Sequence, residues 1–224
     1  MQNQSPQTQT MAESSQGTPA IMVPATTNIF AAATSDYFSG TLPPSVHLPR
    51  GRNRVVTFPV ISGNVISCCG TSYPHDADGG TNLQTYIVPE AGISGIRHTS
   101  KNMFLVGVFL TDEAPPDTMP ATLSFSSDGA AGTISDNFTS LAPELGQTFF
   151  IGNGKVGTDG DLQQFQVPDG ATRLFWGFAD GLNLGDPRYN TPSPAVPGLY
   201  WDNSGAAAVT FAITGDDIDS TSHY

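Results

Sequence analysis

Basic residues are scarce in this chain of 224 residues: eight Lys plus Arg stand against twenty Asp plus Glu, for a formal net charge of -12. A chain so poor in positive charge has no basic patch for a phosphate backbone, which argues against nucleic acid as a partner. Long apolar runs are also missing, and no stretch approaches the ~20 residues that a membrane-spanning helix needs. The acidic excess fits a protein that binds hard cations or one that is simply soluble.

Cysteine is limited to the adjacent pair Cys68-Cys69. A vicinal disulfide would be strained, because neighbouring Cα atoms are closer than disulfide geometry prefers, and two thiols or a bridge to another chain fit the sequence equally well. The spacing matches no zinc motif.

Catalytic signatures are also missing from the sequence. None of the four histidines lies in a nucleophile motif and no Gly-x-Ser-x-Gly occurs, so we expect no enzymatic activity.

The two ends of the chain differ in composition from its middle. Residues 1–24 predict a polar arm, rich in Gln, Ser and Thr, that is either flexible or bound to a partner subunit. The arm lacks a basic start followed by an apolar stretch, so no signal peptide is predicted in this numbering. Either the numbering begins after a cleaved signal, or export uses another route. Residues 216–224 predict a short acidic tail.

Turn-forming residues are abundant, with 24 Gly and 18 Pro, and they favour tight turns over long helices. Between the turns lie short runs rich in β-branched and aromatic residues, without sustained helical periodicity. These runs are at 54–61, 103–110, 121–125, 148–152, 162–168, 172–179 and 207–214. About seven or eight strands joined by loops predict one all-β domain over residues 25–215, a jelly-roll-like β-sandwich.

Two loops contain residues that could bind a ligand. In TSYPHDADGGT (71–81), Asp76 and Asp78 resemble part of a calcium loop, but two further ligand positions of an EF-hand fall on Gly80 and Ile87. Asx-turn chemistry explains the same aspartates without a metal, so this stretch is a second, weaker candidate site. The stretch GNGKVGTDGDL (152–162) lacks the spacing of a phosphate loop and predicts a Gly-rich hairpin loop.

The main candidate site is in the C-terminal third. Asp180 ends a predicted strand, and a Pro-Gly turn, Leu199, Asp202 and Asn203 precede the last predicted strand. Calcium takes about six to eight oxygen ligands, and these side chains with the Leu199 carbonyl could supply part of that shell. A turn capped by the Asp-Asn pair is the alternative, and spacing alone favours neither interpretation.

The blocks QQFQVPDGATRLFWGFAD (163–180) and VPGLYWDNSG (196–205) resemble PA-IL-like domains, the family of small galactophilic, calcium-dependent bacterial lectins. The resemblance covers about residues 25–214 and is closest to secreted domains of environmental bacteria. It implies a jelly-roll β-sandwich in which calcium bridges the protein to vicinal hydroxyls of a sugar.

Carried over to this chain, the resemblance implies calcium ligands at Asp180, Asp202, Asn203, Leu199 and Tyr73, the last two through their carbonyls. The sugar would meet Asp180, Asp202 and Asn203, with His75 as a candidate contact. The chain departs from the family in two places: Asp202 stands where the family has an amide, and residues 181–195 are inserted where the lectin continues directly.

These features predict a calcium-dependent carbohydrate-binding protein, extracellular or at the cell surface, with a galactose-like sugar as the candidate ligand. The polar arm favours a homo-oligomer or another assembly partner. A structural subunit of a fibre, capsid or surface layer is the alternative, with calcium only stiffening the loop. In that case the protein would be a component of a virion or filament.

Overall fold

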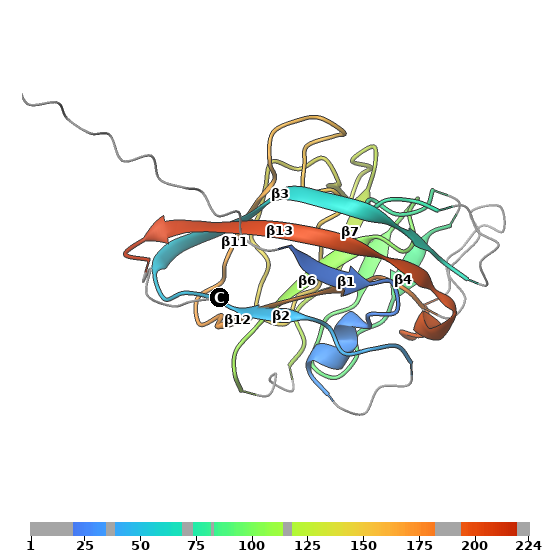
Figure 1. Ribbon diagram of the computed structural model, residues 1–224, viewed down its shortest axis with the longest axis horizontal. Helices are drawn as coiled ribbons and strands as arrows, with labels where there is room; N and C mark the ends of the chain where they lie inside the picture. The colour runs from blue at the N-terminus through green and yellow to red at the C-terminus, as the bar shows by residue number, and fades with distance from the viewer. Residues whose placement is uncertain are drawn as a thin grey trace, which may run out of the picture.

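The structure is a computed structural model that describes residues 20–34, 39–68, 74–81, 83–113, 118–181 and 194–218. Strands dominate these residues, which include no α-helix and only the short 3-10 helices η1 (Ile29–Ala32) and η3 (Tyr200–Asp202) (Figure 1). The predicted all-β class is therefore confirmed. No helix in the described ranges is long and apolar enough to cross a membrane. The predicted arm up to residue 19 and residues 182–193 of the insert lie outside the described residues.

The described residues form three sheets. The first has the order β1-β13-β3-β11-β9 and consists of β1 (Ile21–Pro24), β13 (Ser204–Asp216), β3 (Arg52–Ile66), β11 (Gln164–Gln166) and β9 (Ser140–Leu141). The second has the order β10-β6-β12-β2 and consists of β10 (Phe149–Phe150), β6 (Leu105–Leu110), β12 (Arg173–Phe178) and β2 (Ser45–His47). The third has the order β4-β5-β7-β8 and consists of β4 (Thr85–Ile87), β5 (Ile96–His98), β7 (Leu123–Ser126) and β8 (Ile134–Ser135).

The long antiparallel pair β3–β13 is the central part of the first sheet. Its register runs from Ser204 opposite Ile66 to Asp216 opposite Arg52, and the two strands lie side by side along the length of the molecule (Figure 1). Along β13 the burial alternates with a period of two: the side chains of Ala207, Val209 and Phe211 are buried, while those between them are partly exposed. One face of this sheet therefore covers the core, and the other faces solvent.

The second sheet is buried on both faces. All six residues of β6 are buried; Leu105 and Phe109 pack into the core shared with the first sheet, and Val106 and Val108 pack into a second core. Residues of β4, β5 and β7 line that second core, so the small third sheet covers the other side. A strand buried on both sides needs a continuous apolar run, which explains the sequence LVGVFL. The first two sheets pack as in a β-sandwich, and the jelly-roll connectivity stays a prediction.

All seven strand predictions are confirmed, and the further strands are short. These are β1, β2, β4, β5, β8 and β9, each of two to four residues, which is too short to produce a clear alternation in the sequence. Two domain boundaries need correction. Residues Ile21–Pro24 pair with β13, so they belong to the sheet and not to the predicted arm 1–24. Asp216 still pairs with Arg52, so β13 overlaps the start of the predicted tail 216–224.

Several chain segments converge at one end of the first two sheets. There β1 ends, β3 ends at Ile66, β12 ends at Phe178, and β13 begins at Ser204 after η3. This end lies at the right of Figure 1, where η3 leads into β13. The convergence brings the loop after β12 next to the loop before β13, although the two are about twenty residues apart in the chain.

Candidate functional site

The turn before β13 has a fixed conformation. Leu199 adopts a left-handed backbone conformation with φ 64° and ψ 7°, which costs a non-glycine residue roughly 1 kcal/mol or more. The Leu199 carbonyl accepts a hydrogen bond from the Asp202 N–H at 3.2 Å, and the Tyr200 carbonyl accepts one from the Asn203 N–H at 3.4 Å. Such backbone strain clusters at ligand-binding loops, which makes this turn a candidate site.

Tyr200 anchors the turn to the core. Its side chain is fully buried, and its hydroxyl donates to the Phe178 carbonyl at 3.0 Å. The same hydroxyl lies 3.4 Å from the Asp180 N–H, which donates to it. Burial, followed by the charge of Asp180, raises the pKa of Tyr200 well above its ordinary value, so this phenol stays protonated. The anchor holds η3 against the end of β12.

Asp180 is a buried carboxylate just beyond the end of β12. One oxygen accepts the Gly181 N–H at 2.8 Å, and the other accepts the Asn203 Nδ2–H at 2.7 Å. Burial raises its pKa to about 6; the two hydrogen bonds oppose this shift, and the negative charge of Asp202 adds to it. Among the described residues, no basic side chain pairs with Asp180, which explains why the ionised form is disfavoured.

Asn203 is brought into direct contact with Asp180, as the calcium prediction requires, but its nitrogen faces the carboxylate. The side-chain amide donates to Asp180, and its oxygen accepts the Cys68 N–H at 3.2 Å. The same amide nitrogen is 3.4 Å from the Ala25 carbonyl and 3.5 Å from the Met103 sulfur. The amide oxygen would have to turn toward Asp180 before both could bind one cation.

The other two predicted contacts of the site are Tyr73 and His75. Tyr73 lies outside the described residues, as does Cys69. His75 pairs with Val65 in a bridge, and Val65 pairs in turn with Gly205 of β13. Neighbouring strands lie about 4.8 Å apart, so two such spacings, about 10 Å, separate the His75 backbone from β13. The His75 Nε2 is buried and has no hydrogen-bond partner within the described residues.

The second acidic loop makes contacts typical of structural residues. Asp76 accepts the Asp78 N–H at 3.0 Å, which is the Asx turn that the sequence offered as the alternative to a metal. Asp78 accepts two bonds from Asn153, at 2.8 Å from the backbone and 3.0 Å from the side chain. Gly152 leaves room for this clamp, because a Cβ there would collide with the Asp78 carboxylate. Asp78 thus fixes the loop over residues 152–162, which a Lys155–Leu162 bridge closes, as the hairpin-loop prediction requires.

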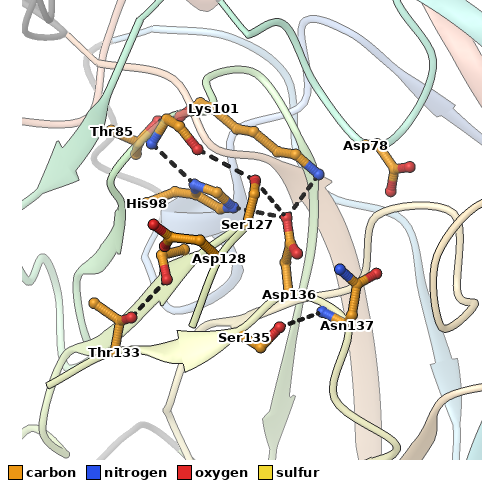
Figure 2. A network of polar contacts seen from close by, with 12 residues as sticks. Asp78, Thr85, His98, Lys101, Ser127, Asp128, Thr133, Ser135, Asp136 and Asn137 are labelled. Carbon is orange, nitrogen blue, oxygen red and sulfur yellow. Dashed lines mark hydrogen bonds and ion pairs between the residues drawn. The ribbon is translucent and has the colours of Figure 1, made fainter. Parts of the chain in front are cut away.

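A buried charged network that no sequence motif predicts lies beside the third sheet (Figure 2). The Asp136 carboxylate accepts bonds from three side chains: Lys101 Nζ at 2.8 Å, Ser127 Oγ at 3.0 Å and His98 Nε2 at 3.3 Å. His98 is fully buried, and its Nδ1 accepts the Ser100 N–H at 3.2 Å. These residues come from three separate places in the chain, the stretch 98–101, Ser127 and Asp136, so no local motif joins them.

The electrostatics of this network identify it as structural. Burial lowers the pKa of His98, as does the charge of Lys101, so the imidazole is neutral and donates from Nε2. Burial alone would raise the pKa of Asp136, but the bonds from His98, Lys101 and Ser127 lower it to about 2. Both imidazole nitrogens are already used in hydrogen bonds, Nε2 to Asp136 and Nδ1 to the Ser100 N–H. The arrangement therefore pairs a buried carboxylate with a cation and two further hydrogen-bond donors.

No group of three or more His, Cys, Asp or Glu side chains close enough to hold a metal ion occurs in the described parts of the chain. The candidate cation site therefore depends on two carboxylates, Asp180 and Asp202, with amide and carbonyl oxygens beside them. No family model matches the chain, and no curated protein and no solved structure matches it either. The resemblance to PA-IL-like lectins stays a prediction from the residues themselves.

The buried Asp180 predicts a pH-dependent stability in buffers that contain a chelator. Its pKa of about 6 in the folded state exceeds the ordinary value of 3.8, so the folded protein retains the proton longer than the unfolded chain. Relative to Asp180→Asn, the free energy of unfolding should fall as the pH rises from about 4 to about 6 and then level off. The full decrease should be about 3 kcal/mol, measured by urea denaturation at each pH. Parallel curves for the two proteins would contradict this interpretation.

The buried network predicts a large difference between two ion pairs. Lys101→Met leaves the Asp136 carboxylate without its cation and should lower the free energy of unfolding by about 3 kcal/mol at pH 7. Arg52→Met is the matched control, because the Arg52–Asp217 pair is exposed, with both side chains more than 70% accessible. It should cause no measurable loss. Equal losses in thermal or urea denaturation would show that the network contributes no more than a surface pair.

Proposed function

We propose that this protein binds carbohydrate through a calcium ion held by Asp180, Asp202 and Asn203. The observation that carries the proposal is the environment of Asp180: a buried carboxylate, next to a second acid, with no basic partner among the described residues. A divalent cation would favour the ionised form that burial disfavours. The available donors are carboxylate, amide and carbonyl oxygens, which are the ligands that calcium prefers.

The turn supports the proposal in a second way. Leu199 is held in a left-handed conformation. Within the described residues its carbonyl accepts one hydrogen bond, from the Asp202 N–H, and a carbonyl oxygen has two lone pairs. Such a carbonyl could contribute to a cation shell together with the side chain of Asp202. When bound, calcium would supply open coordination positions for two vicinal hydroxyls of a sugar.

Binding of the cation would require one local rearrangement. The Asn203 amide would have to rotate so that its oxygen replaces its nitrogen on the side of Asp180, breaking the bonds to Asp180 and to the Cys68 N–H. The lost bonds would be offset by the charge-assisted contact with the ion. In this proposal, the Asn203 amide links the loop after β12 to the loop before β13 in the calcium-free protein.

The proposal is one of binding without catalysis, outside the cell or at its surface, with a galactose-like sugar as the first ligand to test. The net charge of -12 suits a neutral ligand bound through a cation better than an anionic one. A jelly-roll connectivity would fit the same interpretation.

Calcium titration by calorimetry, after treatment with a chelator, tests the cation site. We expect a dissociation constant of about 1 mM or tighter for the wild type, and a loss of about tenfold or more in Asp180→Asn. Asp76→Asn is the matched control, because Asp76 is an acid in the separate loop 71–81 and its Asx-turn oxygen is retained.

A glycan array, probed first with calcium and then with a chelator, tests whether the protein binds carbohydrate and whether that binding needs calcium. Binding that survives the chelator, or no calcium uptake at all, would refute the proposal.

The structural-subunit alternative is supported by a different surface. On the outer face of the first sheet, Met22 is 57% exposed and Val60 is 55% exposed. They flank Ala208 and Thr210 of β13, and Ser62 completes an uncharged patch on the same face. A patch of this kind could pack against a second copy of the sheet.

Sedimentation of the full chain tests this alternative. If the outer face mediates self-association, the wild type should sediment as an oligomer, and Met22→Lys combined with Val60→Lys should sediment as a monomer. Met119→Lys is the control, since Met119 is 47% exposed but lies on the segment before β7. A monomeric wild type at millimolar concentration would remove support for the alternative.

A further inference from the structure

Trp201 is exposed to an unusual degree for its residue type. It is 70% accessible, whereas the other tryptophan, Trp176, is fully buried in the core. Tryptophan has the largest apolar surface of any side chain, and leaving it in water forgoes a large favourable contribution to folding. An exposed tryptophan on a fixed turn indicates a surface that contacts something else.

The position of Trp201 connects it with the candidate cation site. It is the middle residue of η3, directly before Asp202 and two residues before Asn203. A 3-10 helix has about three residues per turn, so successive side chains point about 120° apart. Because Tyr200 points into the core, Trp201 and Asp202 emerge on the solvent side of the same turn.

The backbone that carries Trp201 is held at both ends. The Tyr200 hydroxyl is bonded to Phe178, and the Gly198 N–H donates to the Asp180 carbonyl at 3.4 Å. On the other side the Asn203 N–H bonds to the Tyr200 carbonyl. An aromatic ring on such a support loses little conformational freedom on binding, which favours its use as a contact platform.

The groups around Trp201 restrict the class of ligand that could bind there. Asp180 and Asp202 make the neighbourhood acidic, which disfavours phosphates and other anions. A pyranose presents hydroxyls at its edge and C–H bonds on its face, so it can use a cation and an aromatic ring at the same time. Ligand sites commonly combine an apolar aromatic wall with a few polar groups in this way.

We propose that Trp201 stacks on the C–H face of a pyranose whose vicinal hydroxyls meet the cation held by Asp180, Asp202 and Asn203. This inference rests on the proposed function and adds a residue that determines specificity. The site selects sugars with several C–H bonds on one ring face, and rejects those that place hydroxyls against the indole.

The experiment measures calcium affinity and sugar affinity separately, so that the contribution of the cation is distinguished from that of the Trp201 indole. Calcium affinity is measured by calorimetry, and a panel of methyl pyranosides of the common hexoses is then titrated at saturating calcium. Trp201→Ala should bind the best of these sugars about tenfold more weakly, and Trp201→Phe should lose less because it keeps an aromatic face. Both variants should take up calcium as the wild type does. Met119→Ala is the control for removing an exposed apolar side chain elsewhere.

Tryptophan fluorescence gives an independent readout. The sugar should shift the emission of the wild type to shorter wavelength, because the exposed indole of Trp201 becomes covered, and this shift should vanish in Trp201→Phe while Trp176 remains. Unchanged sugar affinity in Trp201→Ala, with calcium and sugar binding intact in the wild type, overturns the stacking inference alone. A parallel loss of calcium affinity in that variant also overturns it, because the role would then be structural. A wild type that binds no calcium, or that binds a trimethylammonium probe in place of every sugar, overturns both proposals.

Discussion

Burial of strand β12 on both faces is the constraint on which the rest of the structure depends. Leu174, Trp176 and Phe178 pack into one core, and Phe175 and Ala179 pack into the other. Gly177 lies so close to η1 that a Cβ there would come within 2.9 Å of the Ile29 nitrogen. A strand fixed in this way determines where its last residues lie. Asp180 follows directly, and its carboxylate meets Asn203 because the strand cannot shift.

Two buried carboxylates in this fold have pKa values shifted in opposite directions, because only one of them has a cation beside it among the described residues. Asp136 pairs with Lys101 and accepts further bonds from His98 and Ser127, so its pKa is lowered to about 2 and it is ionised at neutral pH. The hydrogen bonds that Asp180 accepts from described residues come only from amide groups, and burial raises its pKa to about 6. The first carboxylate is therefore satisfied by the chain itself. The second has a charge that the described residues leave uncompensated, which is the property that a cation site requires.

The turn η3 combines an anchor with exposed groups in three residues. Tyr200 is inserted beneath the end of β12, and its neighbours Trp201 and Asp202 are thereby held at the surface. Rigid support of an exposed loop is how β-sandwiches usually present binding groups. The proposed cation and sugar contacts use this support without demanding any change in the sheets, since only the Asn203 amide has to rotate.

The sequence by itself determined the all-β class and the seven main strands, because alternation, apolar runs and turn residues are local signals. Only the tertiary structure decided the third sheet, the clamp of Asp78 on Asn153 and the network around Asp136. It also decided that Asn203 turns its nitrogen to Asp180 and its oxygen to Cys68, a residue 135 positions away in the chain. Contacts between distant segments depend on how whole sheets pack, and no local pattern of residues encodes that packing.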